Sequence, residues 1–402
     1  MERVVYSDNA ATTPISKNVY NAMLPYLTTG YGNPSSLYAI AREEKKAVDQ
    51  ARKYAAELLG CDPKEIIFTS GGSEADNLAI KGLLFSASLP KNKRHIITST
   101  IEHHAILHTC EFLQRIGYDV TYVNVDEQGH VKLDELEAAI TENTALVTIM
   151  AANNEIGTIQ PLKEIADICH KKGTLFHTDA VQAVGHMPIN VKEMDIDMLS
   201  LSGHKLRGPK GIGALYVRKG IALEPLIHGG GQENGKRSGT ENVAGIVGLG
   251  EAMHYAHEHM DEYIPYVQGL RDHLIEEVLK IPYTTLTGDP VNRLPGTASF
   301  VIECIEGESL VLRLDMAGIA ASTGSACSTG SLDPSHVLMA IGLPHEIAHG
   351  SLRLTLGEQN TMEDVDYLVE KLKGVVQLLR DMSPVWDEKL AGQPMLSLFD
   401  NK

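Results

Sequence analysis

Seven short runs rich in β-branched and aromatic residues dominate the stretch 66–217, and longer amphipathic stretches lie between several of them. The runs are EIIFTS, RHIITST, DVTYVNV, ALVTIMAA, TLFHTD, DMLSLS and GALYV. Helical periodicity marks intervening segments such as 134–140 and 162–171. Strands that alternate with helices at this spacing are typical of an α/β fold. The sequence therefore predicts a large α/β unit built on a seven-stranded, mostly parallel sheet.

The pattern changes near residue 245, where long helical stretches at 248–280 and 363–381 flank a few strand-like runs. A chain of 402 residues also exceeds the roughly 250–300 residues beyond which a single hydrophobic core stops growing. We therefore expect a smaller α+β domain after the large one. The predicted divisions are an N-terminal segment that joins the small domain (1–15), a large domain (16–250) and a small C-terminal domain (251–402).

The composition is ordinary for a globular protein, with 43% hydrophobic and 22% charged residues. A net charge of −17 argues against direct nucleic-acid binding, because phosphate recognition needs a basic surface. No run approaches the ~18 apolar residues of a membrane span. The N-terminal MERVVYSDNAATTP also lacks the apolar core of a signal peptide. We therefore expect a cytoplasmic protein without a membrane partner.

Five cysteines are widely spaced and include no CxxC pair, so the sequence indicates neither a disulfide framework nor a zinc site. Cys110 and Cys169 lie in helical patterns and are interpreted as small core residues. Cys327 differs, because the surrounding STGSACSTGS is rich in glycine and serine and has no apolar periodicity. Such a segment suits a mobile nucleophile better than a packing residue.

Polar groups follow four of the predicted strands. These groups are Ser70-Gly71-Gly72-Ser73, Asn153-Asn154-Glu155, Asp179 with Gln182, and Ser202-Gly203-His204-Lys205. Asn154 and Asp179 are 25 residues apart, and Asp179 and Lys205 are 26 residues apart, which in each case fits about one βα unit. Ligands of open α/β sheets bind at the carboxyl ends of the strands. These groups are therefore predicted to share one edge of the sheet.

FTSGGSEADNLAIKG has the order strand, glycine turn and helix, in which Ser73 and Asp76 match the capping-box spacing. The N–H groups at such a helix start suit a phosphate, although a plain helix start explains the stretch equally well. GGQENGKR nearly matches a P-loop, but Arg237 occupies the position of the magnesium-binding hydroxyl. His104 and His108 form an i,i+4 pair without a suitably spaced third ligand. Neither a nucleoside triphosphatase nor a resident metal site is predicted.

A lysine just after a strand, an aspartate at a strand end and a phosphate cradle are the groups that pyridoxal phosphate requires. Lys205 follows its strand end directly and is the candidate Schiff-base lysine. Lys210 lies deeper in the turn and is interpreted as a solvated cation. Asp179 would keep the ring nitrogen protonated, and Asn154 and Gln182 could bind the ring oxygen. The sequence therefore predicts pyridoxal phosphate as cofactor.

Ten ordered segments between residues 8 and 357 match those of a known family. They are DNAATTP, GNPSS, TSGGSEADNLAI, EHHAIL, NNEIGTIQP, HTDAVQAVG, SGHKLRGPKGIGALY, GGGQENGKRSGTEN, STGSACSTGSLDPSHVL and GSLRLTLG. In them the chain resembles the pyridoxal-phosphate-dependent cysteine desulfurases of the class V, fold-type I aminotransferases. The ninth segment resembles the subgroup with a long cysteine loop, which serves iron–sulfur cluster assembly or tRNA thiolation. The resemblance implies that the small domain carries this loop.

The resemblance also implies roles for single residues. Lys205 would form the Schiff base, Asp179 would pair with the pyridinium, and His103 would stack on the ring. The implied phosphate ligands are Gly72, Ser73, Ser202, His204 and, from the other subunit of a homodimer, Thr240. The implied ring-oxygen ligands are Asn154 and Gln182, and the implied substrate ligands are Arg353, Asn33 and Asn154.

Two positions bear on substrate binding. Arg353 alternates with Leu352 and Leu354 along a predicted strand, so its guanidinium is expected to face a cleft, where it suits a carboxylate. Tyr38 stands where many relatives have a histidine, which bears on the entrance to the active site.

These features predict an enzyme that converts L-cysteine to L-alanine and leaves a persulfide on Cys327. Lys205 would take the Cα proton, His103 would help to move protons, and the Cys327 thiolate would attack the substrate sulfur. The loop would pass the sulfur to an acceptor, such as an iron–sulfur scaffold or a tRNA-thiolation protein, with Cys327 able to ligate a cluster transiently.

Three alternatives remain at this point. A selenocysteine lyase would share nearly every site residue. An ordinary aminotransferase would use Lys205 and Arg353 but would not need Cys327. A non-enzymatic scaffold would bind partners through the acidic surface or the C-terminal tail and would not need a complete cofactor site.

Overall fold

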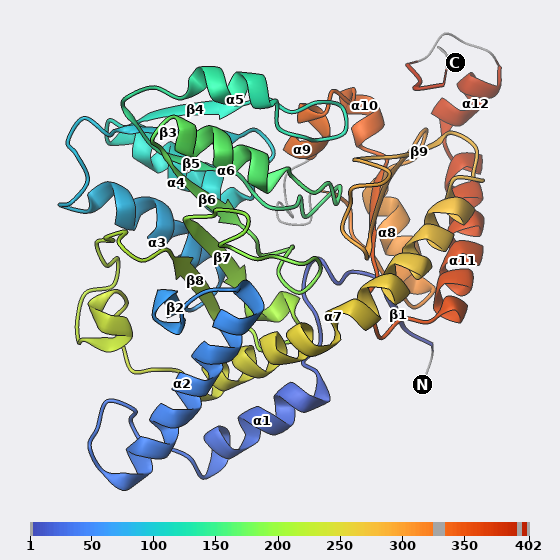
Figure 1. Cartoon of the computed structure of the whole chain (residues 1–402). Helices are drawn as coiled ribbons and strands as arrows, with labels where there is room; N and C mark the ends of the chain where they lie inside the picture. Colours follow the sequence, from blue (N-terminus) through green and yellow to red (C-terminus); the bar gives the residue numbers. More distant parts are fainter. Residues whose placement is uncertain (1–2, 325–333, 392–395, 400–402) are drawn as a thin grey trace.

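All seven predicted strands form, and they make one sheet of order β2-β8-β7-β6-β5-β3-β4 (Figure 1). The computed structural model describes residues 3–324, 334–391 and 396–399. The strands of this sheet are β2 (Ile66–Thr69), β3 (His95–Ser99), β4 (Asp119–Val123), β5 (Thr144–Thr148), β6 (Leu175–Asp179), β7 (Met198–Ser202) and β8 (Gly213–Val217). β8 is antiparallel to β2 and β7, whereas the other pairs are parallel. The predicted seven-stranded, mostly parallel sheet is confirmed.

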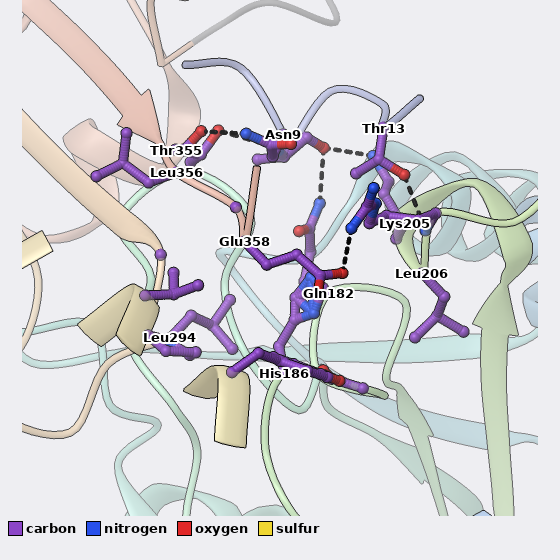
Figure 2. Close-up of a pocket in the computed structure, with 18 of the residues that line it drawn as sticks. Asn9, Thr13, Gln182, His186, Lys205, Leu206, Leu294, Thr355, Leu356 and Glu358 are labelled. Atoms are coloured by element: carbon purple, nitrogen blue, oxygen red, sulfur yellow. Dashed lines mark hydrogen bonds and ion pairs between the residues drawn. The ribbon is translucent and has the colours of Figure 1, made fainter. Parts of the chain in front are cut away.

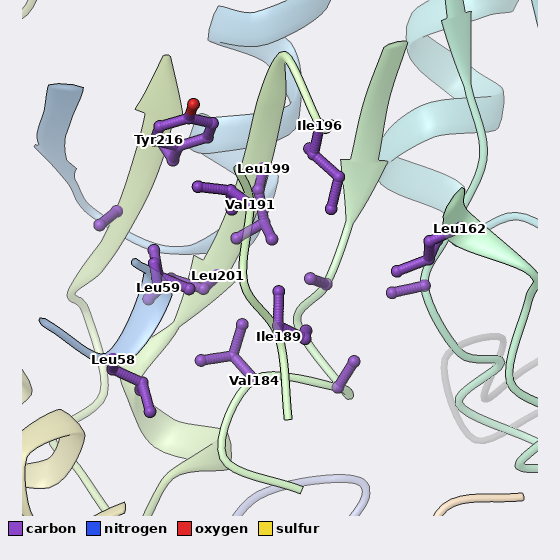
Figure 3. Packing of buried hydrophobic residues seen from close by; sticks show 14 of the residues in the cluster. Leu58, Leu59, Leu162, Val184, Ile189, Val191, Ile196, Leu199, Leu201 and Tyr216 are labelled. Atoms are coloured by element: carbon purple, nitrogen blue, oxygen red, sulfur yellow. The ribbon is translucent and has the colours of Figure 1, made fainter. Parts of the chain in front are cut away.

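Helices cover both faces of this sheet, because successive residues of a strand point to opposite sides. The α-helices of the described chain, including those of the smaller unit, are α1 (Lys17–Thr28), α2 (Ala39–Leu59), α3 (Gly72–Phe85), α4 (His104–Arg115), α5 (Leu133–Ala139), α6 (Leu162–Lys171), α7 (Val243–Val278), α8 (Gly307–Met316), α9 (His336–Ala340), α10 (His345–Ala348), α11 (Met362–Asp381) and α12 (Pro384–Leu390). Phe68 and Val147 pack in one core with residues of α2, α6 and α7, part of which Figure 3 shows. Their chain neighbours Ile67 and Leu146 pack in another core with residues of α3 and α4. Both faces are therefore apolar.

A smaller unit contains the antiparallel sheet β12-β10-β9. The remaining strands are β1 (Val5–Tyr6), β9 (Thr284–Leu286), β10 (Thr297–Ile302), β11 (Ile319–Ala320) and β12 (Ser351–Thr355). β1 pairs in parallel with β11, so the N-terminal segment contacts the smaller unit. α7 crosses residue 250 without a break and contributes Leu249 to the first core and Leu270 to the core of the smaller unit. The exact domain boundaries therefore stay a prediction.

Within the described ranges, no helix combines the length and the apolar composition that a membrane crossing requires.

Candidate active site

The carboxyl ends of β6 and β7 and the first turn of α3 border a cavity of about 950 Å³. The residues that line it are Ala10, Ala11, Gly72, Ser73, Asp76, His103, Met150, Ala152, Asn154, Asp179, Val181, Gln182, Ser202, His204, Lys205 and Arg353. The groups predicted to share one edge of the sheet therefore meet at one cavity. Among the predicted site residues that the structure describes, all lie in this wall except Asn33 and Thr240.

The first turn of α3 forms one end of the cavity. Gly72 begins the helix, and a Cβ atom at this position would lie 2.5 Å from Cγ2 of Val181 and 3.7 Å from Cβ of Ser202. Only a glycine fits this close approach. The unpaired N–H groups of the turn and the hydroxyls of Ser73 and Ser202 give this end the donors that a phosphate needs.

The predicted capping box at Ser73 and Asp76 is wrong. The N-cap is Gly71, which has no side chain, so Ser73 already lies inside the first turn. Glu74 takes over part of the capping role, because its Oε2 accepts a hydrogen bond from Ser70 N at 2.8 Å. Asp76 instead lines the cavity and is 1% exposed.

Asp179 ends β6 and is almost fully buried. Its Oδ1 accepts a hydrogen bond from Val181 N at 2.9 Å. Burial raises the pKa of this carboxyl, whereas His103, the Val181 N–H group and Lys205 act in the opposite direction. A cationic ring nitrogen beside Asp179 would add another favourable charge, so the position suits a partner for a protonated pyridine.

Two imidazoles line the cavity. His103 is the N-cap residue of α4, and its Nδ1 accepts a hydrogen bond from Ala105 N at 3.1 Å. This contact leaves Nε2 to carry the proton of the neutral ring. Burial and two neighbouring lysines lower the pKa of His204 to about 4. His204 is therefore neutral at pH 7, and its Nδ1 lies 3.1 Å from Oγ1 of Thr12.

Lys205 ends the short 3-10 helix η2 (Gly203–Lys205) that follows β7. Its Nζ donates hydrogen bonds to the carbonyl oxygens of Ala10 and Ala11, the second at 2.8 Å. Thr13 Oγ1 donates to His204 O at 2.8 Å and fixes the same turn. The N-terminal segment therefore holds the lysine amine, a role that sequence reasoning did not assign to any residue of DNAATTP.

Arg353 lies in β12 with its side chain in the cavity wall, as the alternation with Leu352 and Leu354 predicts. Nη1 donates a hydrogen bond to Asn154 O at 3.0 Å, and Nη2 pairs with Asp8 Oδ1 at 2.9 Å. Two contacts from different segments thus fix the plane of the guanidinium. Sequence reasoning missed Asp8, which is 345 positions away along the chain.

A second cavity of about 740 Å³ adjoins the first and shares Ala10, Gln182 and Lys205 with it (Figure 2). Gln182 Nε2 donates a hydrogen bond to Ala10 O at 3.0 Å. Arg207 pairs with Glu358 in the wall of the second cavity. Lys205 therefore borders both cavities.

Two described site residues, Asn33 and Thr240, are not in the cavity wall. Asn33 precedes α2, and its Oδ1 accepts a hydrogen bond from Ser35 N at 3.0 Å. Thr240 is exposed on the loop before α7. Cys327 lies outside the described residues. The roles of these three residues stay predictions.

The segment GGQENGKR, which was rejected as a P-loop, makes structural ion pairs. Glu233 and Arg237 of GGQENGKR form ion pairs with Arg52 at 2.7 Å and with Glu74 at 2.9 Å, respectively. The described ranges contain no group of three or more His, Cys, Asp or Glu side chains arranged to hold a metal ion.

Cys110 and Cys169 are fully buried in α4 and α6, as the sequence predicts. Burial raises the pKa of each thiol to about 12. Burial likewise raises the pKa of the Cys61 thiol to about 12. These three thiols are protonated at pH 7 and are therefore poor nucleophiles.

The donors in the first cavity fit pyridoxal phosphate. A helix N-terminus with two serines suits its phosphate, the carboxyl group of Asp179 suits its ring nitrogen, and the amine of Lys205 suits its aldehyde. The imidazole of His103 lies in the same wall.

Comparisons with known proteins agree with this site. The family model "Aminotransferase class-V" matches residues 5–368. "Cysteine desulfurase IscS" of Methanosarcina thermophila is 57% identical over 95% of this chain and 94% of its own. The solved structure "NIFS-LIKE PROTEIN" has a TM-score of 0.88 and 41% identity, and the match covers 94% of this chain and 100% of that one. "SspA in complex with cysteine" has a TM-score of 0.79 and 41% identity, with 89% and 100% covered. The chain belongs to the class V aminotransferase family, whose members generally use pyridoxal phosphate, and within that family to the cysteine desulfurases.

Proposed function

We propose that this cysteine desulfurase binds pyridoxal phosphate at Lys205, converts L-cysteine to L-alanine and collects the sulfur as a persulfide on Cys327. The observation that carries the proposal is the single cavity in which Lys205, Asp179, His103 and Arg353 meet. The similar structure of SspA was solved in complex with cysteine, which supports the same substrate here.

The cofactor, when bound, would withdraw electrons from the substrate Cα and so make its proton acidic. Gly72, Ser73, Ser202 and His204 would hold the phosphate. Asp179 would hold the proton of the ring nitrogen by its negative charge. Asn154 and Gln182 would bind the ring oxygen, and His103 would contact the ring.

The chain's own residues would then position the substrate and move its protons. Arg353 would bind the substrate carboxylate, because its guanidinium is already oriented by Asn154 O and Asp8. Lys205 Nζ would accept the Cα proton, and the carbonyl oxygens of Ala10 and Ala11 would stabilise the resulting ammonium. His103 would exchange a proton at Nε2.

The sulfur transfer is balanced without an external oxidant. The Cys327 thiolate forms a bond to the substrate sulfur while the bond from that sulfur to Cβ breaks, and Cβ takes up a proton. One thiol and one L-cysteine thus become one persulfide and one L-alanine. The persulfide would supply an acceptor protein for iron–sulfur cluster assembly or tRNA thiolation. The cytoplasmic location stays a prediction.

We further propose a homodimer in which Thr240 of one subunit completes the phosphate site of the other. Thr240 is exposed and outside the cavity wall of its own chain. Large exposed apolar side chains also gather on α1 and the loop after it. These side chains are Tyr20, Leu24, Leu27 and Tyr31. Such a surface suits a contact between copies of the chain.

The direct test supplies purified protein with cofactor, L-cysteine and a thiol reductant, and measures sulfide and alanine. Equal amounts of both products are expected. Formation of a keto acid without sulfide would instead identify an ordinary aminotransferase. A parallel assay supplies selenocysteine and compares the release of selenide with the release of sulfide from L-cysteine. Release of selenide alone would identify a selenocysteine lyase.

Asp179→Asn is expected to retain the cofactor but to lower turnover of L-cysteine by about a hundredfold or more, an effect of the size that electrostatic groups have in other active sites. A neutral amide cannot keep the ring nitrogen protonated. Asp289→Asn is a matched control, because Asp289 is also buried but pairs with His130 outside the cavity. Steady-state rates and the cofactor absorbance measure both effects. Near-normal turnover in Asp179→Asn would exclude Asp179 as the ring partner.

A further inference from the structure

Three buried carboxyl groups lie near enough to one another for their charges to interact, and two of them, Asp76 and Asp179, line the cavity. Asp76 of α3 is 1% exposed, Glu102 before α4 is fully buried, and Asp179 ends β6. Only Asp179 has a role in the proposed mechanism. Three neighbouring carboxylates in a dry interior would repel one another strongly, so some of them must hold a proton.

A hydrogen-bonded row of side chains crosses the sheet next to Asp76. Thr148 Oγ1 is 2.8 Å from His177 Nδ1, and His177 Nε2 is 2.9 Å from Ser200 Oγ. Ser200 acts to lower the pKa of Asp76, which sits next to this chain of side chains. Burial lowers the pKa of His177 to about 3. His177 is therefore neutral, and the hydrogen-bonded row of Thr148, His177 and Ser200 places no cation beside Asp76.

Asp76 lines the cavity, but one of its carboxyl oxygens is buried. Its Oδ1 is buried, has no hydrogen-bond partner among the described residues, and lies 3.9 Å from His177 Nε2. Asp76 and Asp179 line the same cavity and are close enough for their charges to interact. Oδ1 is thus the atom of Asp76 that can carry a proton and donate a hydrogen bond.

The surroundings decide which carboxyl keeps the negative charge. Burial and then the charge of Asp179 raise the pKa of Asp76 well above its usual value. Burial also raises the pKa of Glu102 to about 8, although Ser99 Oγ donates to it at 2.6 Å. Burial raises the pKa of Asp179 as well, but the Val181 N–H group donates to its Oδ1 at 2.9 Å, and His103 and Lys205 also act to lower that pKa. The negative charge therefore settles on Asp179.

We propose that Asp76 is a positioning residue: a neutral carboxylic acid that supplies a hydrogen-bond donor beside Asp179 and leaves Asp179 as the anion that faces the cofactor ring. The inference rests on the proposed cofactor site. A neutral donor next to a carboxylate stabilises its charge, whereas a second carboxylate would oppose it.

The protonation state is tested in the apoprotein by infrared spectroscopy. Wild type should show the carbonyl band of neutral carboxylic acids, and Asp76→Asn should remove part of that band. Asp289→Asn should leave the band unchanged, because hydrogen bonds from backbone N–H groups and His130 hold the pKa of Asp289 near 2 against the effect of burial. An unchanged band in Asp76→Asn would overturn the proposal. This measurement needs no cofactor, so its result is separate from failure of the proposed function.

The positioning role is tested by cofactor affinity of the apoprotein. Asp76→Asn keeps a neutral donor and should bind pyridoxal phosphate within about threefold of wild type, whereas Asp76→Ala should bind about tenfold or more weakly, the size of one hydrogen bond to a charged group. The pH midpoint of the cofactor absorbance should move in Asp76→Ala alone. Equal losses in both variants, or none in either, would overturn the role. If thermal melting shows that Asp76→Ala does not fold, Asp76→Asn decides alone, and a loss of tenfold or more there would contradict the proposal.

Discussion

Lys205→Ala should lose turnover of L-cysteine by about a thousandfold or more, because a positioned general base alone contributes about 10²–10⁴ in rate. The variant should still bind the cofactor, since the first turn of α3, Ser202 and Asp179 are unchanged. Borohydride should fix the cofactor to the peptide that contains Lys205 in wild type and to no peptide in the variant. The expected loss therefore concerns covalent attachment and proton transfer rather than binding.

Lys210→Ala is the matched control for this experiment. Lys210 lies five positions further along the same turn, but it is exposed and does not line the cavity. Its removal should leave rate and trapping unchanged. Lys205 instead has its Nζ held by two carbonyl oxygens of the N-terminal segment. Covalent trapping on Lys210, or a wild-type protein that ignores added cofactor, would contradict the proposed site.

The part of the site that the sequence predicts best depends on the order of strands and helices along the chain. Asp179 ends a strand, Asn154 and Lys205 follow strands, and parallel strands necessarily bring their carboxyl ends to one edge of the sheet. Correct placement of the strands was therefore enough to predict that these three residues meet in one cavity. Glycine at position 72 also has a local reason, because any larger residue at this helix start would collide with the Val181 side chain.

The contacts that the sequence did not predict join segments far apart in the chain. Asp8 reaches Arg353 across 345 positions, and Lys205 reaches Ala10 across 195. No periodicity or spacing encodes such pairs; the pairing of β1 with β11 and hydrogen bonds from Asn9 to Thr355 and from Thr13 to His204 bring the N-terminal segment near. Asp76 was misassigned for a different reason. The helix begins at Gly72, two residues earlier than the start that a Ser73 cap would require, so Asp76 lies inside the helix and lines the cavity.

Cys327→Ser should separate sulfur transfer from all other steps. The variant should keep the cofactor on Lys205 and still bind L-cysteine, because the proposed cofactor and substrate ligands are unchanged. Sulfide release should fall by about a hundredfold or more, since a serine hydroxyl cannot accept sulfur as a persulfide and a missing nucleophile has effects of at least this size. Selenide release from selenocysteine should fall less if selenium leaves without attack by the thiol.

The other four cysteines are the controls for this substitution. Burial raises the pKa of Cys61, Cys110 and Cys169 to about 12, and it raises the pKa of Cys304 as well, so none of the four thiols is a ready thiolate at pH 7. Replacing any of them by alanine should change the free energy of unfolding by about 1 kcal/mol and leave the sulfide rate intact. Labelling with radioactive sulfur from L-cysteine should mark the Cys327 peptide alone. If Cys327→Ser released sulfide at the wild-type rate, the persulfide would have to form elsewhere or not at all, even with every cofactor contact in place.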